Sequence, residues 1–230
     1  MAENRITKKM VKNHWTYNWW KYLLLVFLCA AAVDVTFTTT AYRPPEEKKI
    51  EIYILNGYCD TGAMQAELEP QFFEAHPDQE ELTILNINLA GDDIYASMQF
   101  STYAAAQQGD VCLMPLSEVQ KLASDGAEYA FMDLTPYIES GVIDVQDIDL
   151  TAGRMVSSTG EEGIYAIPAD SLYGLLAYGN DPADSMLCIM DYNGNEETSA
   201  AVLSMMIERY RTPKPEGYGD KTQQKPAALF

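Results

Sequence analysis

The sequence contains few of the residues from which catalytic and metal sites are built. Only two histidines occur, His14 in a basic leader and His76 directly before a proline. No zinc-type Cys/His set, phosphate-binding glycine loop or Gly-x-Ser-x-Gly elbow is present in the 230 residues. A surface turn accounts for His76 more simply than catalysis does. The sequence therefore predicts no enzyme, no metal site and no cofactor.

Basic residues are also scarce outside the N-terminus. Five of the 15 Lys and Arg residues lie within the first 21 positions, whereas only two of the 34 acidic residues precede residue 43. From residue 43 onward, 32 acidic and 10 basic residues leave a net charge of −22. So acidic a surface argues against nucleic acid and anionic lipid as partners. Solubility is the simplest role for this charge.

One long apolar segment follows the basic leader, which comprises residues 1–18. Residues 22–33 form an uninterrupted apolar run, preceded by Trp15, Trp19 and Trp20. Residues 19–42 are long enough to span a bilayer, which takes about 20 mostly apolar residues. Basic residues favour the cytoplasmic side of a membrane. We therefore expect residues 19–42 to be an uncleaved transmembrane signal anchor in the cell membrane, with the remaining chain extracytoplasmic.

A cleaved signal peptide is the alternative for the same segment. A short apolar core is typical of signal peptides, and Ala30, Ala31 and Ala32 supply the small residues of a cleavage site. The protein would then be secreted, and its main domain would again be extracytoplasmic. After this segment we expect a stalk at 43–49, where two prolines precede four charged residues.

The stalk is followed by a pattern of alternating strands and helices. Strands are predicted at 50–55, 82–89 and 110–114, and helices at 63–75, 93–108 and 117–124. Three consecutive strand–helix units predict an α/β fold with a mostly parallel, doubly wound sheet and right-handed crossovers. The first strand should lie between the other two, because the winding direction reverses once.

The second half of the chain is less regular. Strands are predicted at 163–168, 171–179 and 186–190, a short helix at 144–154, and a last helix at 196–210. The main domain thus covers 50–211. Residues 212–230 are rich in Pro, Lys, Gln and Gly, which predicts a disordered tail.

Three cysteines follow the stalk, namely Cys59, Cys112 and Cys188. Their odd number and wide spacing do not make a disulfide framework. Cys112 and Cys188 lie in apolar, strand-like runs and are most simply buried thiols. Whether one pair forms a disulfide stays open.

Several short motifs carry a resemblance to a known family. Residues 72–78 (Phe-Phe-Glu-Ala-His-Pro-Asp) are followed by 109–114 (Gly-Asp-Val-Cys-Leu-Met), 122–126 (Leu-Ala-Ser-Asp-Gly) and 165–168 (Tyr-Ala-Ile-Pro). In this order they resemble the extracellular solute-binding proteins of ABC importers, the sugar-binding class. The resemblance implies a periplasmic-binding-protein-like fold, a sugar or peptide ligand, and a permease or another membrane protein as partner.

The resemblance covers only the first lobe of that family. Only 17 residues separate Pro168 from Met186, where the family builds its second lobe. Solute-binding proteins hold ligand between two lobes that close by hinge motion, so one lobe supplies half a cleft. Two functions follow. The chain is either a membrane-tethered solute-binding module, or a degenerate one-lobe domain that serves as a protein-interaction or assembly module without ligand transport.

The candidate ligand-binding residues lie where the predicted strands end. Open parallel sheets bind ligands beyond the carboxyl ends of their strands. The polar and aromatic residues at these ends are Asn56, Tyr58, Asp60, Thr61, Asp93, Ser117, Asp170, Ser171 and Tyr173. The same residue types form turns and cap helices. A concave polar face would favour solute binding, whereas a face covered by the 168–186 connection would favour the interaction module.

Overall fold

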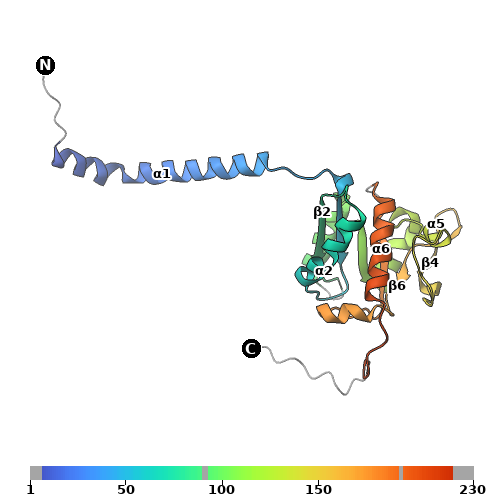
Figure 1. Cartoon of the computed structure of the whole chain (residues 1–230). Helices are drawn as coiled ribbons and strands as arrows, with labels where there is room; N and C mark the ends of the chain where they lie inside the picture. The colour runs from blue at the N-terminus through green and yellow to red at the C-terminus, as the bar shows by residue number, and fades with distance from the viewer. Residues whose placement is uncertain (1–6, 90–92, 192–193, 220–230) are drawn as a thin grey trace. The chain divides into compact units, whose positions relative to one another are not determined.

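The chain divides into two units, Met1–Arg43 and Pro44–Phe230, in a computed structural model (Figure 1). The structure describes residues 7–89, 93–191 and 194–219. The first unit is built from one helix, α1 (Lys8–Thr40), of 33 residues. At 1.5 Å per residue this helix is about 50 Å long, which exceeds the hydrocarbon thickness of a bilayer.

The length and composition of α1 suit a membrane-spanning helix, although a signal sequence near the N-terminus has the same features. Its polar threonines do not interrupt it. Thr36 and Thr39 donate their hydroxyl hydrogens to the carbonyls of Ala32 and Val35 at 2.7 and 2.8 Å. Each hydroxyl is therefore satisfied within the helix, as an apolar environment requires.

The second unit is built on a five-stranded sheet in the order β2-β1-β3-β7-β6. The strands are β1 (Lys49–Ile54), β2 (Glu81–Asn86), β3 (Val111–Pro115), β6 (Ile167–Pro168) and β7 (Ser185–Ile189). Strand β1 pairs in parallel with β2 and β3, and β7 pairs antiparallel with β3 and β6. Four strands thus share one direction. This confirms the expected α/β fold, its mainly parallel sheet, and the place of β1 between β2 and β3.

Both faces of the sheet are covered, because β1 contributes apolar side chains to each. Ile50, Ile52 and Ile54 belong to a core cluster that includes residues of α2 (Thr61–Ala75) and α6 (Glu196–Tyr210). Tyr53 and Leu55 belong to a second cluster with residues of α3 (Ile94–Ala105) and α4 (Leu116–Leu122). In Figure 1, α2 and α6 are drawn alongside the sheet. The apolar density of the first strand was therefore a sound sign of burial on both faces.

Short elements fill the rest of the second unit. They are η1 (Glu46–Lys48), η2 (Ala123–Asp125), η3 (Ala127–Tyr129), α5 (Thr135–Glu139), η4 (Leu150–Gly153), β4 (Arg154–Val156), β5 (Glu162–Ile164) and η5 (Tyr173–Tyr178). Strands β4 and β5 form a separate antiparallel hairpin. Helix α6 has the bounds expected from the sequence.

The strand expected at 171–179 is wrong, because this segment is the 3₁₀ helix η5. Leu175 and Tyr178 are buried at a spacing of three residues. Gly174 lies so close to α6 that an added Cβ would be 2.9 Å from the Cα of Tyr210. Gly179 ends the turn with a φ of +76°. A short apolar run fits a strand and a helix equally well, and packing against α6 decided between them.

Two other local expectations also need correction. The single strand expected at 163–168 is divided between β5 and β6, which belong to different sheets. The helix expected at 144–154 is reduced to the turn η4, and Asp147 interrupts it with a φ of +64°. Gly153 of η4 packs against the strand break, since an added Cβ would lie 1.8 Å from the carbonyl oxygen of Ala166.

The described part of the expected tail contacts the domain. Thr212 forms an isolated parallel bridge with Leu172. Tyr218 donates its hydroxyl hydrogen to a carboxylate oxygen of Asp181 and packs edge-on against Tyr173, with ring centroids 4.9 Å apart. Residues 212–219 are therefore tied to the segment before β7. The remainder of the expected tail, 220–230, lies outside the described residues.

Candidate functional site

The connection between β6 and β7, residues 169–184, lies over the carboxyl ends of β1 and β3. We call it the crossover segment. The backbone N–H of Asp60, in the loop after β1, donates to the carbonyl of Tyr178 at 2.8 Å. The N–H of Leu116, directly after β3, donates to the carbonyl of Asp184 at 2.8 Å. The position where open α/β sheets bind ligands is thus occupied by the chain itself.

Asn56 fastens the crossover segment to the end of β1. Its amide nitrogen donates to the hydroxyl oxygen of Ser185 at 2.8 Å and to the carbonyl of Asp181 at 2.9 Å. Its amide oxygen accepts a hydrogen bond from the amide of Asn180 at 2.7 Å. Asn180 is only 1% exposed. The polar atoms of Asn56 are therefore engaged within the domain and are not offered to a ligand.

Five other candidate residues lie on loops and helix starts, three of them around the start of α2 and the other two at α3 and α4. Asp60 caps α2 by accepting from the N–H of Ala63 at 3.1 Å, and Asp93 caps α3 by accepting from the N–H of Tyr95 at 2.8 Å. Thr61 is the first residue of α2, Ser117 is exposed in α4, and Tyr58 is exposed with its ring near Gly179. Capping and turn formation account for the two aspartates.

Asp170, Ser171 and Tyr173 are brought together. They line a cavity of about 290 Å³ with Asp147, Ile148, Asp149 and Pro168. The hydroxyl of Ser171 is buried and has no hydrogen-bond partner among the described residues. Three carboxylates around this cavity disfavour an anionic ligand. Its volume lies at the lower end of the range for small-molecule sites, about 300–1,000 Å³.

A groove lies along α3 and was not anticipated from the sequence. It has a volume of about 940 Å³ and is lined mainly by α3, with Leu89 on one side and Glu118 and Lys121 of α4 on the other. Ile94 and Met98 of α3 line it and are 72% and 62% exposed. The uncharged sequence of α3, Ile-Tyr-Ala-Ser-Met-Gln-Phe-Ser-Thr-Tyr-Ala-Ala, was the signal that could have revealed it.

Little of α3 faces the core. Only Ala96 and Phe100 are buried within it, while Tyr95 is 83% exposed. Three charged residues line the groove, namely Asp93, Glu118 and Lys121, and Lys121 donates to Glu118 at 3.2 Å. The groove thus carries a charge of only −1 on a very acidic domain, and it combines apolar side chains with the hydroxyls of Ser97, Ser101 and Thr102. Such exposed apolar patches mark interaction sites more often than chance.

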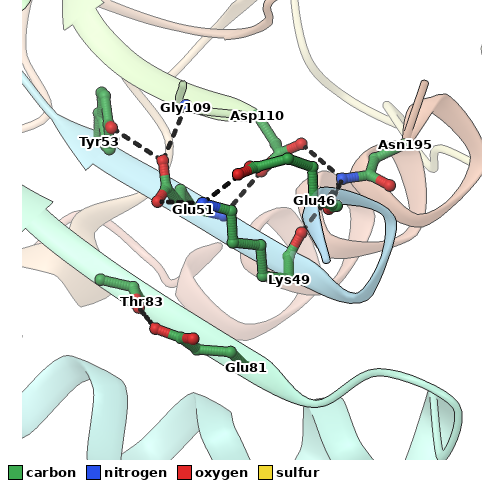
Figure 2. Close-up of polar contacts among 9 residues, drawn as sticks. All are labelled: Glu46, Lys49, Glu51, Tyr53, Glu81, Thr83, Gly109, Asp110 and Asn195. Carbon is green, nitrogen blue, oxygen red and sulfur yellow. Dashed lines mark hydrogen bonds and ion pairs between the residues drawn. The ribbon is translucent and has the colours of Figure 1, made fainter. Parts of the chain in front are cut away.

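A buried polar cluster lies at the opposite, amino ends of the strands (Figure 2). The side-chain amide of Asn195 donates to the carbonyls of Glu46 and Lys49 at 3.0 and 3.1 Å and to a carboxylate oxygen of Asp110 at 3.1 Å. The other oxygen of Asp110 accepts from the N–H of Glu51 at 2.7 Å. This cluster joins the turn before β1 to the start of α6, so its role is structural.

Two ion pairs border this cluster. Lys49 lies 2.7 Å from a carboxylate oxygen of Glu46 and 3.3 Å from one of Glu51. Burial lowers the pKa of Lys49, but the bonds and charges of these two carboxylates outweigh it and raise the pKa. Glu51 also accepts from the hydroxyl of Tyr53 at 2.9 Å and from the N–H of Gly109 at 3.0 Å. The carboxylates therefore have partners within the domain.

Comparisons with known proteins give weak likenesses. No family model matches the chain, and no curated protein matches it. Among solved structures, an extracellular solute-binding protein family 1 member from Alicyclobacillus acidocaldarius is 17% identical, with a TM-score of 0.38. The GacH receptor of Streptomyces glaucescens is 19% identical, with a TM-score of 0.36, and RafE from Streptococcus pneumoniae is 17% identical, with a TM-score of 0.33.

The three matches cover 53–55% of this chain but only 28–29% of the neighbours. The chain thus spans less than a third of the length of the structures it matches. The first neighbour belongs to the class that the sequence motifs resemble. Likenesses with such low identities and TM-scores do not indicate an activity. The functional conclusion therefore rests on the geometry of this protein.

Proposed function

We propose that this protein is a membrane-tethered, extracytoplasmic domain that binds a partner protein and does not capture a solute at the ends of its strands. Its fold would be a single periplasmic-binding-protein-like lobe with a doubly wound sheet, anchored by residues 19–42. The observation that carries this proposal is the crossover segment, which covers the carboxyl ends of β1 and β3 through the bonds of Asp60 and Leu116. A covered face at the strand ends is the feature expected of an interaction module, whereas a solute-binding module would leave this face open.

Solute binding at the covered face would be weak. A good site buries about 70–90% of a small ligand, and one lobe without a cleft covers much less. A sugar hydroxyl would need free hydrogen-bonding atoms, but those of Asn56 already bond to Ser185, Asp181 and Asn180. We expect dissociation constants in the millimolar range or above, equivalent to about −4 kcal/mol or weaker.

The charge and composition of the α3 groove indicate which kind of partner surface would bind there. The domain carries a net charge of −22 from residue 43 onward, so two copies repel each other, and acidic partners are also disfavoured. Yet α3 itself contains no charged residue, and the three charged residues at the groove, Asp93, Glu118 and Lys121, sum to only −1. The complementary surface is an uncharged apolar helix face of another protein. Such helix-in-groove contacts use anchors at three- and four-residue spacing, as Ile94 and Met98 provide.

A second candidate function is favoured by the small cavity at Asp170, Ser171 and Tyr173. The unpartnered hydroxyl of Ser171 needs a hydrogen bond, and the three surrounding aspartates would accept hydrogen bonds from a hydroxylated or cationic solute. A solute bound there would be delivered to a permease, in keeping with the resemblance to ABC importers. The cavity is small, so we rank this function second.

Photo-crosslinking in cells tests the first proposal. A photoreactive amino acid at Met98, in the groove, is compared with one at Val142, an exposed apolar position in another part of the domain. We expect one defined protein to crosslink at position 98 and not at 142. The purified partner should bind the full-length protein in nanodiscs, and Met98→Asp should weaken that binding at least tenfold.

Equal labelling at both positions, or crosslinking of position 98 to a second copy of the chain, would contradict a dedicated partner site. Calorimetry with sugars, amino acids and short peptides provides the complementary test. Micromolar binding that Ser171→Ala abolishes would establish the second candidate function in place of the first.

A further inference from the structure

Two of the three cysteines in the main domain lie side by side in the sheet. Cys112 of β3 and Cys188 of β7 are directly opposed in the antiparallel register. Side chains of directly opposed residues lie on the same face of a sheet, with Cβ atoms about 4.5–5.5 Å apart. The Sγ of Cys188 lies 3.6 Å from the carbonyl oxygen of Cys112. Their separation of 76 positions in the sequence gave no sign of this proximity.

The Cα separation of this strand pair lies within the range of disulfides. Met190 donates its N–H to the carbonyl of Asp110 at 3.0 Å, two positions along both strands from the cysteines. Because pair types alternate along an antiparallel ladder, Cys112 and Cys188 also form a hydrogen-bonded pair, with a Cα separation of about 5.5 Å. Disulfides span Cα separations of about 4.4–6.8 Å. Disulfides also need Cβ atoms about 3.5–4.5 Å apart, so the bond requires a rotation of the side chains and a closer approach of the two strands by up to about 1–2 Å.

Cys59 is excluded as a partner for either residue. It belongs to the core cluster on the α2 side of the sheet and contacts the sulfur of Met64 at 3.9 Å, whereas Cys112 and Cys188 belong to the cluster on the other side. The remaining cysteine, Cys29, lies in α1, in the other unit. Geometry thus selects a single pair from the three cysteines of the main domain.

We infer that Cys112 and Cys188 form a disulfide in the mature protein, made as β7 pairs with β3 during folding outside the cytoplasm. This inference rests on the extracytoplasmic location in the proposed function. All four cysteines are free thiols in the structure, which represents the reduced form. The oxidant is a thiol–disulfide oxidoreductase of the cell envelope. Such enzymes act in oxidising compartments where disulfides persist.

The reaction is two successive thiol–disulfide exchanges. One cysteine thiolate attacks the oxidoreductase disulfide, which gives a mixed disulfide and releases one enzyme thiol. The second thiolate then attacks the bound sulfur, forms the Cys112–Cys188 bond and releases the second enzyme thiol. The chain loses two hydrogens and two electrons, and the oxidoreductase gains them.

The timing of this exchange follows from burial. Both thiols are fully buried, and burial raises the pKa of each, so the reactive thiolate is scarce in the folded domain. Exchange therefore takes place before the strands close. For the same reason the finished bond resists reductants added to the folded protein.

Thiol trapping tests the inference on the full-length exported protein. The protein is denatured without reductant in N-ethylmaleimide, digested and analysed by mass spectrometry. A glutamate-specific protease is required, since no Lys or Arg separates Cys59 from Cys112. We expect maleimide on Cys29 and Cys59 only, and a linked peptide pair with a mass two hydrogens below the sum of its reduced parts. Maleimide on all four cysteines, or any other pairing, would overturn the inference.

Variants and refolding separate the possible causes of failure. Cys112→Ser and Cys188→Ser should each free the opposite thiol, whereas Cys59→Ser should leave the link intact. The melting temperature should fall by roughly 10 °C when the bond is reduced in denaturant and the protein is refolded and melted with its thiols kept reduced. If the reduced chain forms the link on refolding with oxidised glutathione but the exported protein lacks it, the inference fails because of the compartment, not the strand register.

Discussion

Replacing Asn195 with alanine should destabilise the main domain by an amount that the structure allows us to estimate. The amide of Asn195 faces three acceptors at 3.0–3.1 Å, namely the carbonyls of Glu46 and Lys49 and the carboxylate of Asp110. An amide nitrogen has only two hydrogens, so the three contacts share them. With ~1 kcal/mol for a neutral bond and ~1.5 kcal/mol or more for one to a charged group, the loss is about 2–3 kcal/mol.

The estimate is supported by burial. Asp110 is 2% exposed and Asn195 is 8% exposed, so water does not readily replace the lost donor. For a domain of this size the loss corresponds to a fall in melting temperature of roughly 5–10 °C. The main domain contains no tryptophan, because Trp15, Trp19 and Trp20 all lie in α1. Circular dichroism of the full-length protein in nanodiscs is therefore a better assay than tryptophan fluorescence.

Two further variants sharpen this test. Gln120→Ala, at an exposed position of α4, is the matched control and should change stability by less than ~0.5 kcal/mol. Asn195→Asp removes the amide donor and places a second carboxylate beside Asp110, so at neutral pH it should be at least as destabilising as alanine. Its deficit should shrink as the pH falls and one carboxyl gains a proton. If Asn195→Ala melts within error of the control, the cluster does not hold the start of β1 to α6.

Three further predictions concern other parts of the molecule. Gly153→Ala should abolish stable folding in urea denaturation, because the Cβ of the new alanine would lie 1.8 Å from the carbonyl oxygen of Ala166. A stable variant would refute the close packing between η4 and the break between β5 and β6. Hydrogen bonds from Tyr178 and Arg209 lower the pKa of Glu67 below 4.5, so the stability that Glu67 contributes is present above that pH and is lost as the pH falls through the lowered value. The difference in melting temperature between wild type and Glu67→Gln should therefore vanish in acid, and a difference that stays constant with pH would exclude this linkage. Protease added to intact cells should remove the main domain and leave α1 in the membrane, whereas a soluble secreted form would show that the segment is cleaved.

The sequence was sufficient for the part of the fold that depends on local pattern and chain direction. Apolar runs separated by amphipathic helices led to β1, β2 and β3, to their parallel pairing and to the position of β1 between the other two. The same reasoning located α6 to the residue. These features follow from hydrophobic periodicity and from the handedness of strand–helix–strand units, both of which act over short stretches of chain.

The candidate site was anticipated only in part. Three candidates from the rule of strand ends, Asp170, Ser171 and Tyr173, line one cavity, because all three follow β6 closely in sequence; that they bind a ligand stays a prediction. The rule could not show that Asn56 would bond to Asn180, more than 120 residues away. It also missed the α3 groove, because an exposed apolar helix face and a buried one have the same sequence pattern until the neighbouring elements are known.

What the sequence alone determined is therefore the α/β class, the first three strands, the acidic surface and the apolar N-terminal helix. The tertiary structure decided the rest. It laid the crossover segment over the strand ends, made residues 173–178 a 3₁₀ helix against α6, and placed Cys112 opposite Cys188. The physical reason is that these outcomes depend on contacts between residues far apart in the chain. Such contacts are selected by packing and by the hydrogen bonds that buried groups require, and neither has a period that can be recognised in the sequence.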